Sequence, residues 1–178
     1  MYRVTNLTAY DTDTALNHYI EAGVPAANIT VAMPLYGVPF YNTDGLGQPF
    51  GFAKDTKERR RSGENGGTPV PVNILYNDLP PSGPTVFYDD NAKASYSYNS
   101  TERIFVSYDD VQSVTFKTQY AIARGLAGNV FYEARGDNAL GNNSLVGTSS
   151  SVFVNLSNDT NNLYYPTSEY DNIRAGLA

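Results

Sequence analysis

Two apolar segments, each preceded by a helical pattern and each ending close to an aromatic residue, constrain the fold of this chain most strongly. The first is Asn28–Tyr36, within AGVPAANITVAMPLYGVPF, and the second is Asn129–Glu133, within GLAGNVFYEARGD. Continuous apolar strands of this kind are typical of parallel sheets that are buried on both faces. We therefore expect two helix–strand steps of an α/β fold. Each step places an aromatic ring at the carboxyl end of its strand, the end at which parallel barrels bind ligands.

The segments before these two strands carry helix signals. Asp11–Glu21 offers Asp or Thr as a cap, and Gly23 follows it as a stop signal. Asp109 or Asp110 is expected to cap a second helix that ends near Arg124. The first helix has four apolar residues spaced for one face, Ala15, Leu16, Tyr19 and Ile20.

The chain between the two steps has a different composition. Tyr41–Gly83 is rich in Gly, Pro, Asn and charged residues and has no sustained period, which indicates a loop or an insertion. Thr85–Tyr108 contains three short runs rich in Tyr and β-branched residues, TVFYDD, ASYSYN and RIFVSY, separated by turn residues. This pattern predicts an antiparallel meander that forms a small sheet of its own.

The composition of the chain argues against some classes of binding partner. The net charge is −6 over 178 residues, so nucleic acid and anionic lipid surfaces would repel the chain, and we expect neither nucleic acid nor a membrane as a partner. The sequence contains no apolar run long enough to cross a bilayer. Charged residues make up only 17% and tyrosine occurs 15 times. Hydroxylated rings with few charges suit neutral, hydroxyl-rich ligands, although a tyrosine-rich core is an equal alternative.

Cysteine is absent from the sequence, which removes disulfides, thiolate zinc sites and thiol nucleophiles, and we expect no metal and no cofactor. The amino terminus shows no signal-peptide pattern, so a secreted parent protein would have lost its front end. The glycosylation sequons nevertheless favour a secreted glycoprotein and an extracellular location. They lie at Asn6, Asn28, Asn99, Asn142, Asn155 and Asn158.

The order of these motifs resembles the secreted glycoside hydrolase family 18 chitinases of filamentous fungi. Their seventh barrel strand looks like xGVPxxKIxxGxPxYGRxF, and this chain departs from it at Val38, where the family has Arg. The positions that fit are Gly23, Val24, Pro25, Ile29, Pro34, Tyr36, Gly37 and Phe40. Further segments that resemble the family are Asn42–Phe50, Asn77–Gly83, Tyr88–Asn99, Ser107–Asp110 with Lys117, Gly141–Thr148 and Tyr165–Gly176.

The resemblance covers nearly the whole chain and implies a fold. Residues 1–40 and 109–178 would form an incomplete (β/α)8 TIM barrel that holds strands seven and eight with their flanking helices. Residues 41–108 would form the family's chitinase insertion domain, so the class is α/β with an inserted α+β domain. Two of eight strands leave their outer edges unpaired. We therefore expect self-association, pairing with a missing N-terminal half, or marginal stability.

The resemblance also implies an activity that this sequence does not support. The family hydrolyses β-1,4-N-acetylglucosamine polymers by substrate assistance, with the Glu of an Asp-x-x-Asp-x-Asp-x-Glu motif as the acid. That spacing does not occur in this sequence, and we assign no catalytic residue. We expect a truncated chitinase-like protein that is inactive alone. The paired acids are interpreted as helix caps and turn residues, Asp11 with Asp13, Asp89 with Asp90 and Asp109 with Asp110.

A part of the sugar-binding surface remains in this interpretation, made of Tyr36, Tyr132 and Glu133. Tyr132 stands where the family has a Trp under the central sugar, and the resemblance implies a cis peptide bond between Tyr132 and Glu133. For Glu133 and Asp137 a structural role is favoured over a catalytic one. Chitin or N-acetylglucosamine oligomers are the expected ligands. Two alternatives stay open, a non-enzymatic chitin-oligosaccharide binder and a fragment that completes another chain's barrel.

Overall fold

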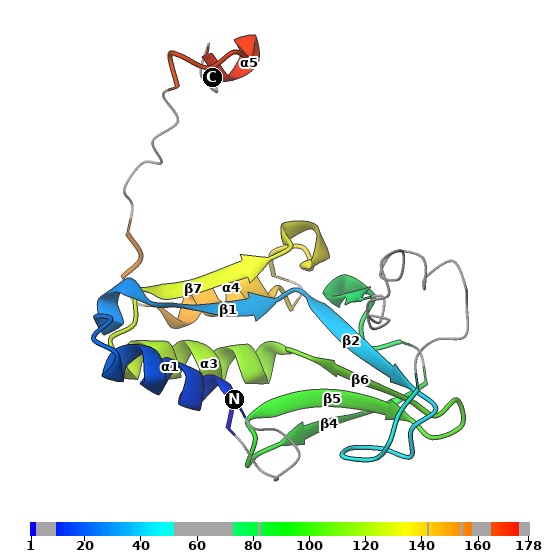
Figure 1. Ribbon diagram of the computed structural model, residues 1–178. Helices are drawn as coiled ribbons and strands as arrows, with labels where there is room; N and C mark the ends of the chain where they lie inside the picture. Colours follow the sequence, from blue (N-terminus) through cyan, green and yellow to red (C-terminus); the bar gives the residue numbers. More distant parts are fainter. Residues whose placement is uncertain are drawn as a thin grey trace, which may run out of the picture.

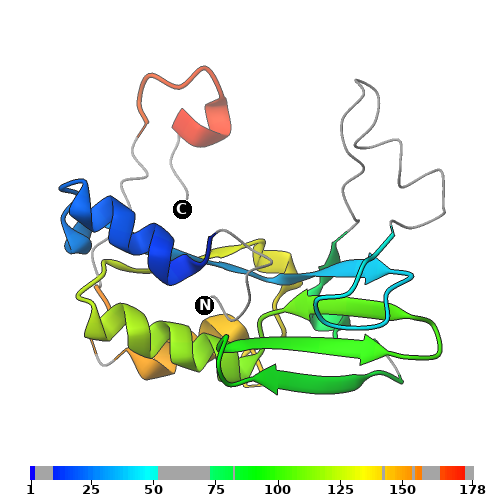
Figure 2. The same ribbon diagram turned by 60° about the horizontal axis from the view of Figure 1, so that its bottom comes forward.

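The described part of the chain contains two sheets that are joined by one short connection. Strands β1 and β7 form a parallel pair, and five further strands form an antiparallel sheet in the order β3-β2-β6-β5-β4. Both views show the antiparallel sheet beside the helical part of the molecule (Figure 1, Figure 2). The computed structural model describes residues 1–2, 10–51, 73–81, 83–141, 143–153, 155–157 and 165–174.

The first helix, α1, spans Thr12–Glu21 and begins where the sequence predicts. The Asp11 carboxylate accepts a hydrogen bond from the Thr14 amide at 2.8 Å, which satisfies one of the free amides of the first turn. Only the Leu16 side of α1 faces the core. The apolar face predicted for this helix is therefore too wide, because Tyr19 is 60% exposed. A short 3-10 turn, η1 (Ala26–Asn28), leads into the first strand.

The parallel pair consists of β1 (Thr30–Pro34) and β7 (Gly128–Tyr132). Its register runs from Thr30 opposite Gly128 to Pro34 opposite Tyr132. Val31 and Met33 are buried, whereas Val130 on β7 is 49% exposed. The predicted burial of both faces is wrong for this pair, because α3 packs on one face of it and α1 lies on that same side (Figure 1). Side chains alternate between the two faces of a strand, so every second residue meets solvent.

The helical layer is completed by α3 (Val111–Ala123) and α4 (Leu145–Val152). The predicted cap of α3 is confirmed: Asp110 and Ser113 form a reciprocal capping box. Val114 and Ala121 of α3 are fully buried in the core. A single turn, α5 (Asp171–Arg174), ends the described chain.

The predicted meander is confirmed as β4 (Thr85–Asp89), β5 (Ala94–Asn99) and β6 (Ile104–Tyr108), which pair antiparallel in chain order. The sheet is larger than predicted, because β2 (Tyr36–Tyr41) pairs with β6 and β3 (Ile74–Leu75) pairs with β2. Both extra strands fall partly or wholly within the predicted loop. The short helix η2 (Tyr76–Asp78) follows β3.

The strand predicted over Asn28–Tyr36 is interrupted. The chain leaves the parallel pair at Pro34 and enters the antiparallel sheet at Tyr36, with the fully buried Leu35 between them. The Leu35 amide donates to the Tyr132 carbonyl at 2.7 Å, and the Leu35 carbonyl accepts from the Tyr76 amide at 2.9 Å. Leu35 therefore joins the two sheets, while the division of the chain into residues 1–40 with 109–178 and residues 41–108 stays a prediction.

The two faces of the antiparallel sheet differ in character. One face carries a row of rings in which Phe87 stacks on Tyr96 and Tyr96 on Phe105, each pair with centroids 5.0 Å apart. On the other face Ser95 lies opposite Tyr108, and Ser97 lies two residues further along β5. That second face turns toward α3 and the core, so its hydroxyl groups are buried.

Candidate functional site

The two predicted aromatic residues lie at the carboxyl ends of β1 and β7. Tyr132 is the last residue of β7 and pairs with Pro34, the last residue of β1. Its side chain is 71% exposed. Tyr36 begins β2 directly after Leu35, whose amide is bound to the Tyr132 carbonyl. The fold thus brings the backbones of Tyr36 and Tyr132 together at the carboxyl end of the parallel pair.

The peptide bond between Tyr132 and Glu133 is cis, as the resemblance implied. Glu133 then precedes a short 3-10 turn, η3 (Ala134–Gly136). The Glu133 carboxylate accepts from the Arg135 guanidinium at 3.1 Å in a solvent-exposed ion pair. Such pairs are worth about 0–1 kcal/mol in proteins. The ion pair therefore holds Glu133 only weakly.

The turn after β7 is held from the antiparallel sheet. A Cβ atom placed on the buried Gly136 would lie 2.2 Å from the Leu35 carbonyl oxygen, so only glycine fits against that backbone. The side-chain amide of Asn77, in η2, donates to the Arg135 carbonyl at 3.0 Å. The sequence patterns did not single out Asn77, because its partners are distant in sequence and no local signal marks them.

Asp137 has a structural role, as the sequence analysis favoured. Its carboxylate accepts from the Ser144 hydroxyl at 2.7 Å, from the Leu145 amide at 2.8 Å and from the Val146 amide at 3.1 Å. These groups form the amino-terminal turn of α4, where a negative charge also interacts favourably with the helix dipole. Asp137 thus anchors the loop after β7 to α4.

The other paired acids stabilise local structure, as predicted. Asp11 and Asp110 cap α1 and α3, and Asp89 accepts from the Asn91 and Ala92 amides in the turn after β4. Asp109 instead forms a buried ion pair with Lys117, with both carboxylate oxygens 2.6 Å from Nζ.

Within the described ranges, no three His, Asp or Glu side chains gather closely enough to hold a metal ion. None of the helices described is both long enough and apolar enough to span a membrane.

Comparison with known proteins shows the family. The model of "Glycosyl hydrolases family 18" matches residues 1–137, and this chain belongs to that family. Endochitinase 1 of Metarhizium robertsii is 41% identical over 97% of the chain. Chitinase 1 of Aphanocladium album is 37% identical, also over 97% of the chain. In both cases the chain spans 38% of the relative's length.

Solved structures agree with this assignment. The class V chitinase from Nicotiana tobaccum matches with a TM-score of 0.62 and 27% identity over 79% of this chain and 38% of that one. A class V chitinase mutant from Cycas revoluta, solved in complex with (GlcNAc)3, matches with a TM-score of 0.63 over 82% of this chain and 39% of that one. At 22% identity the second likeness concerns the fold alone. The structural neighbours are thus family 18 chitinases.

Proposed function

We propose that this chain forms part of the sugar-binding surface of a family 18 chitinase and binds N-acetylglucosamine oligomers without cleaving them alone. The exposed ring of Tyr132 carries the proposal, because it stands at the carboxyl end of β7 beside the start of β2. Aromatic rings offer a flat apolar face to the C–H face of a sugar, and a phenol adds a hydrogen-bonding hydroxyl. Tyr36 and Glu133 complete the proposed sugar-binding set.

The backbone around Tyr132 supports this role. The Tyr132 carbonyl accepts from Leu35, and Gly136 packs against the Leu35 carbonyl, so the ring's attachment point is held on both sides. A backbone that is already held in place loses little further conformational entropy when the ring contacts a sugar. Beside it, Glu133 offers carboxylate oxygens that accept hydrogen bonds from sugar hydroxyls.

Hydrolysis needs an acid that these residues do not supply. Asp137 is engaged by three donors at the start of α4. The sequence contains no Asp-x-x-Asp-x-Asp-x-Glu spacing. In this proposal, the proton for the leaving oxygen comes from residues outside this chain.

The proposal extends to the architecture. The parallel pair would be strands seven and eight of an eight-stranded barrel, and the antiparallel sheet would be the insertion domain that walls the sugar cleft. A family of chitin-degrading enzymes and exposed sequons at Asn28 and Asn155 favour an extracellular location. Three sequons predicted above, Asn6, Asn142 and Asn158, lie outside the described residues.

A second candidate function is completion of a barrel with another chain or with a second copy of this one. The half-exposed Val130 and the exposed Ala32 favour it, because they form a sheet face without cover in the described structure. Size-exclusion chromatography tests this function, with and without a polypeptide that carries the first six strands of a family relative. A chain that stays monomeric in both experiments contradicts it.

Calorimetric titration with the N-acetylglucosamine tetramer tests the sugar-binding role. An aromatic contact contributes about 1 kcal/mol, so we expect Tyr132→Ala to weaken binding about fivefold or more. Tyr19→Ala is the matched control, because Tyr19 is a similarly exposed ring on α1, away from the site. Equal affinities for the native chain and Tyr132→Ala would contradict the proposal.

A further inference from the structure

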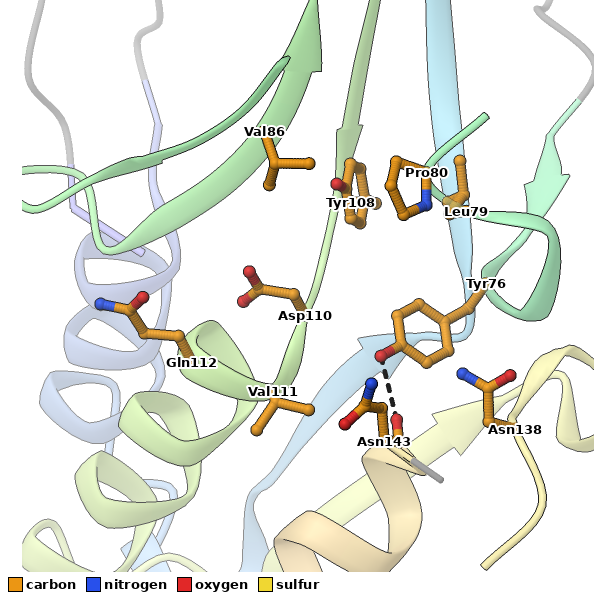
Figure 3. A pocket seen from close by; sticks show the side chains of 10 residues that line it. All are labelled: Tyr76, Leu79, Pro80, Val86, Tyr108, Asp110, Val111, Gln112, Asn138 and Asn143. Atoms are coloured by element: carbon orange, nitrogen blue, oxygen red, sulfur yellow. Dashed lines mark hydrogen bonds between the residues drawn. The ribbon is translucent and has the colours of Figure 1, made fainter. Parts of the chain in front are cut away.

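A cavity of about 410 Å³ lies between the antiparallel sheet and the start of α3. Small-ligand sites commonly measure about 300–1,000 Å³. None of Tyr36, Tyr132 and Glu133 lines this cavity, which is therefore separate from the proposed sugar-binding set. Figure 3 shows Tyr76 projecting into it from one side, with Tyr108 and Asp110 across from that ring.

The cavity borders buried hydroxyl groups that lack partners. Tyr108 is only 6% exposed, and its hydroxyl makes no hydrogen bond of regular geometry within the described residues, although the Ser97 hydroxyl lies close enough to offset part of the rise in pKa that burial causes for Tyr108. The hydroxyls of Ser95 and Ser97, on the same face of the sheet, are likewise unpaired among the described residues. Burying a hydroxyl without a partner destabilises the folded state. A ligand group that reached the Tyr108 hydroxyl would remove that cost.

The charge of the cavity is negative. Asp110 lines it, and no Lys or Arg is among its lining residues. Asp110 uses Oδ1 to accept from the Ser113 amide, but a carboxylate accepts about four hydrogen bonds. Burial and then the Asp110 charge raise the pKa of Tyr108, and they also raise the pKa of Tyr76 to about 12. Both phenols therefore stay protonated, and anions are disfavoured at this site.

The remaining wall is apolar. Leu79, Pro80 and Val86 line the side of the cavity next to Tyr108 (Figure 3). Aliphatic side chains at this position suit the carbon skeleton of a ligand, and the Tyr76 ring adds an electron-rich face that attracts a cation. The cavity thus joins one carboxylate, two phenols and an apolar wall.

We propose that this cavity binds a small organic ammonium ion that also carries hydroxyl groups. The ammonium group contacts the Asp110 carboxylate, a ligand hydroxyl pairs with the Tyr108 hydroxyl, and the carbon skeleton packs on Leu79 and Val86. The site does not depend on the proposed function, because it shares no residue with the proposed sugar-binding set.

Titration of the ¹⁵N-labelled chain with glucosamine, followed by amide chemical shifts, tests the proposal. Glucose is the neutral control probe, since it keeps the ring and the hydroxyls but has no ammonium group. We expect saturable millimolar binding of glucosamine that shifts the amides of residues 108–112, and at least tenfold weaker binding of glucose. Equal binding of the two sugars, or no saturable binding of glucosamine, overturns the proposal.

Variants assign the binding to the cavity. Asp110→Asn removes the charge but keeps a good helix cap, and we expect a tenfold or greater loss of glucosamine affinity. Tyr108→Phe removes only the hydroxyl and should weaken binding at least threefold, which keeps the test valid if Asp110→Asn misfolds. Glu21→Gln makes the same charge change at the exposed end of α1 and should have no effect. Glucosamine affinity that is unchanged in Tyr108→Phe refutes the assignment.

One further variant separates the two proposals. Tyr132→Ala should leave glucosamine binding in the cavity unchanged, even where it abolishes binding of the N-acetylglucosamine tetramer. A loss of the glucosamine shifts in Tyr132→Ala would place the ammonium ligand at the sugar-binding set and overturn the second site.

Discussion

Replacement of Asp137 distinguishes an anchoring carboxylate from a sugar-binding one. In the folded chain this carboxylate holds the Ser144 hydroxyl and the amides of Leu145 and Val146 at distances of 2.7–3.1 Å. Asparagine keeps the shape and one acceptor oxygen but loses the charge and the second acceptor. Alanine removes every one of these contacts and leaves Ser144, which accepts from the Gly147 amide at 2.8 Å, as the cap of α4.

The expected cost follows from these contacts. A hydrogen bond to a charged group contributes about 1.5–3 kcal/mol, and the bonds of one carboxylate are not additive. A negative charge at a helix start adds about 0.3–1 kcal/mol. We therefore expect Asp137→Asn to lower the free energy of unfolding by about 2 kcal/mol and Asp137→Ala by about 3–4 kcal/mol.

Urea denaturation measures this change, and calorimetric titration with the N-acetylglucosamine tetramer provides the second reading. With a denaturant slope near 2 kcal/mol per M, Asp137→Asn should lower the unfolding midpoint by about 1 M. Its oligosaccharide affinity should stay within about twofold of the native value. Asp90→Asn is the control, because its pair with Lys93 is exposed and contributes little. Unchanged stability combined with lost sugar binding would refute the anchoring role.

Three further outcomes are expected. Asp109→Asn leaves the buried Lys117 ammonium unpaired and should cost about 3–5 kcal/mol; Asp109→Asn combined with Lys117→Met should recover much of that loss, and a larger loss in the double variant would contradict it. The pKa of Tyr76 rises from 10.0 to about 12 on folding, so the folded state favours the protonated phenol. The contribution of Tyr76 to the free energy of unfolding is therefore fully present below pH 10 and falls by about 3 kcal/mol as the pH rises to about 12. An identical alkaline unfolding profile in Tyr76→Phe would exclude this source. Gly136→Ala pushes a methyl group into the Leu35 carbonyl and should lower thermal stability by about 1–3 kcal/mol, whereas a neutral effect would show that the turn after β7 relaxes freely.

Elements with local signals were predictable from the sequence. Asp11 and Asp110 precede apolar patterns of helical period, and both residues cap helices in the structure. The meander followed from alternating residues between turn signals, and all three of its strands occur. These features depend on residues within a few positions of one another, so a single sequence contains the information.

Elements that depend on distant partners were not predictable. The break at Leu35 arises because its amide binds the Tyr132 carbonyl, nearly a hundred residues away. Strand β3 lies within the segment of loop composition, and β2 overlaps that segment only at Tyr41. Both strands depend on distant partners, because β2 pairs with β6 and β3 pairs with β2. An apolar run such as TVAMP shows that a strand is buried but not on how many faces.

The candidate site shows the same division. Tyr132 and its cis peptide bond followed from the family resemblance. The contacts that hold the turn after β7, from Asn77 to Arg135 and from Asp137 to the start of α4, became visible only in three dimensions. The sequence motif therefore identified the exposed Tyr132 ring, and the structure was needed to find the contacts that hold the turn beside it.

Chemical-shift mapping of the ¹⁵N-labelled chain during titration with the N-acetylglucosamine tetramer locates the sugar-binding surface and detects cleavage in one experiment. We expect saturable shifts centred on the amides of Leu35, Tyr36, Glu133 and Arg135, with the tetramer recovered intact at the end of the titration. Saturable binding that leaves these amides unmoved would contradict the proposed surface. Shorter sugars released by the pure chain would contradict binding without cleavage.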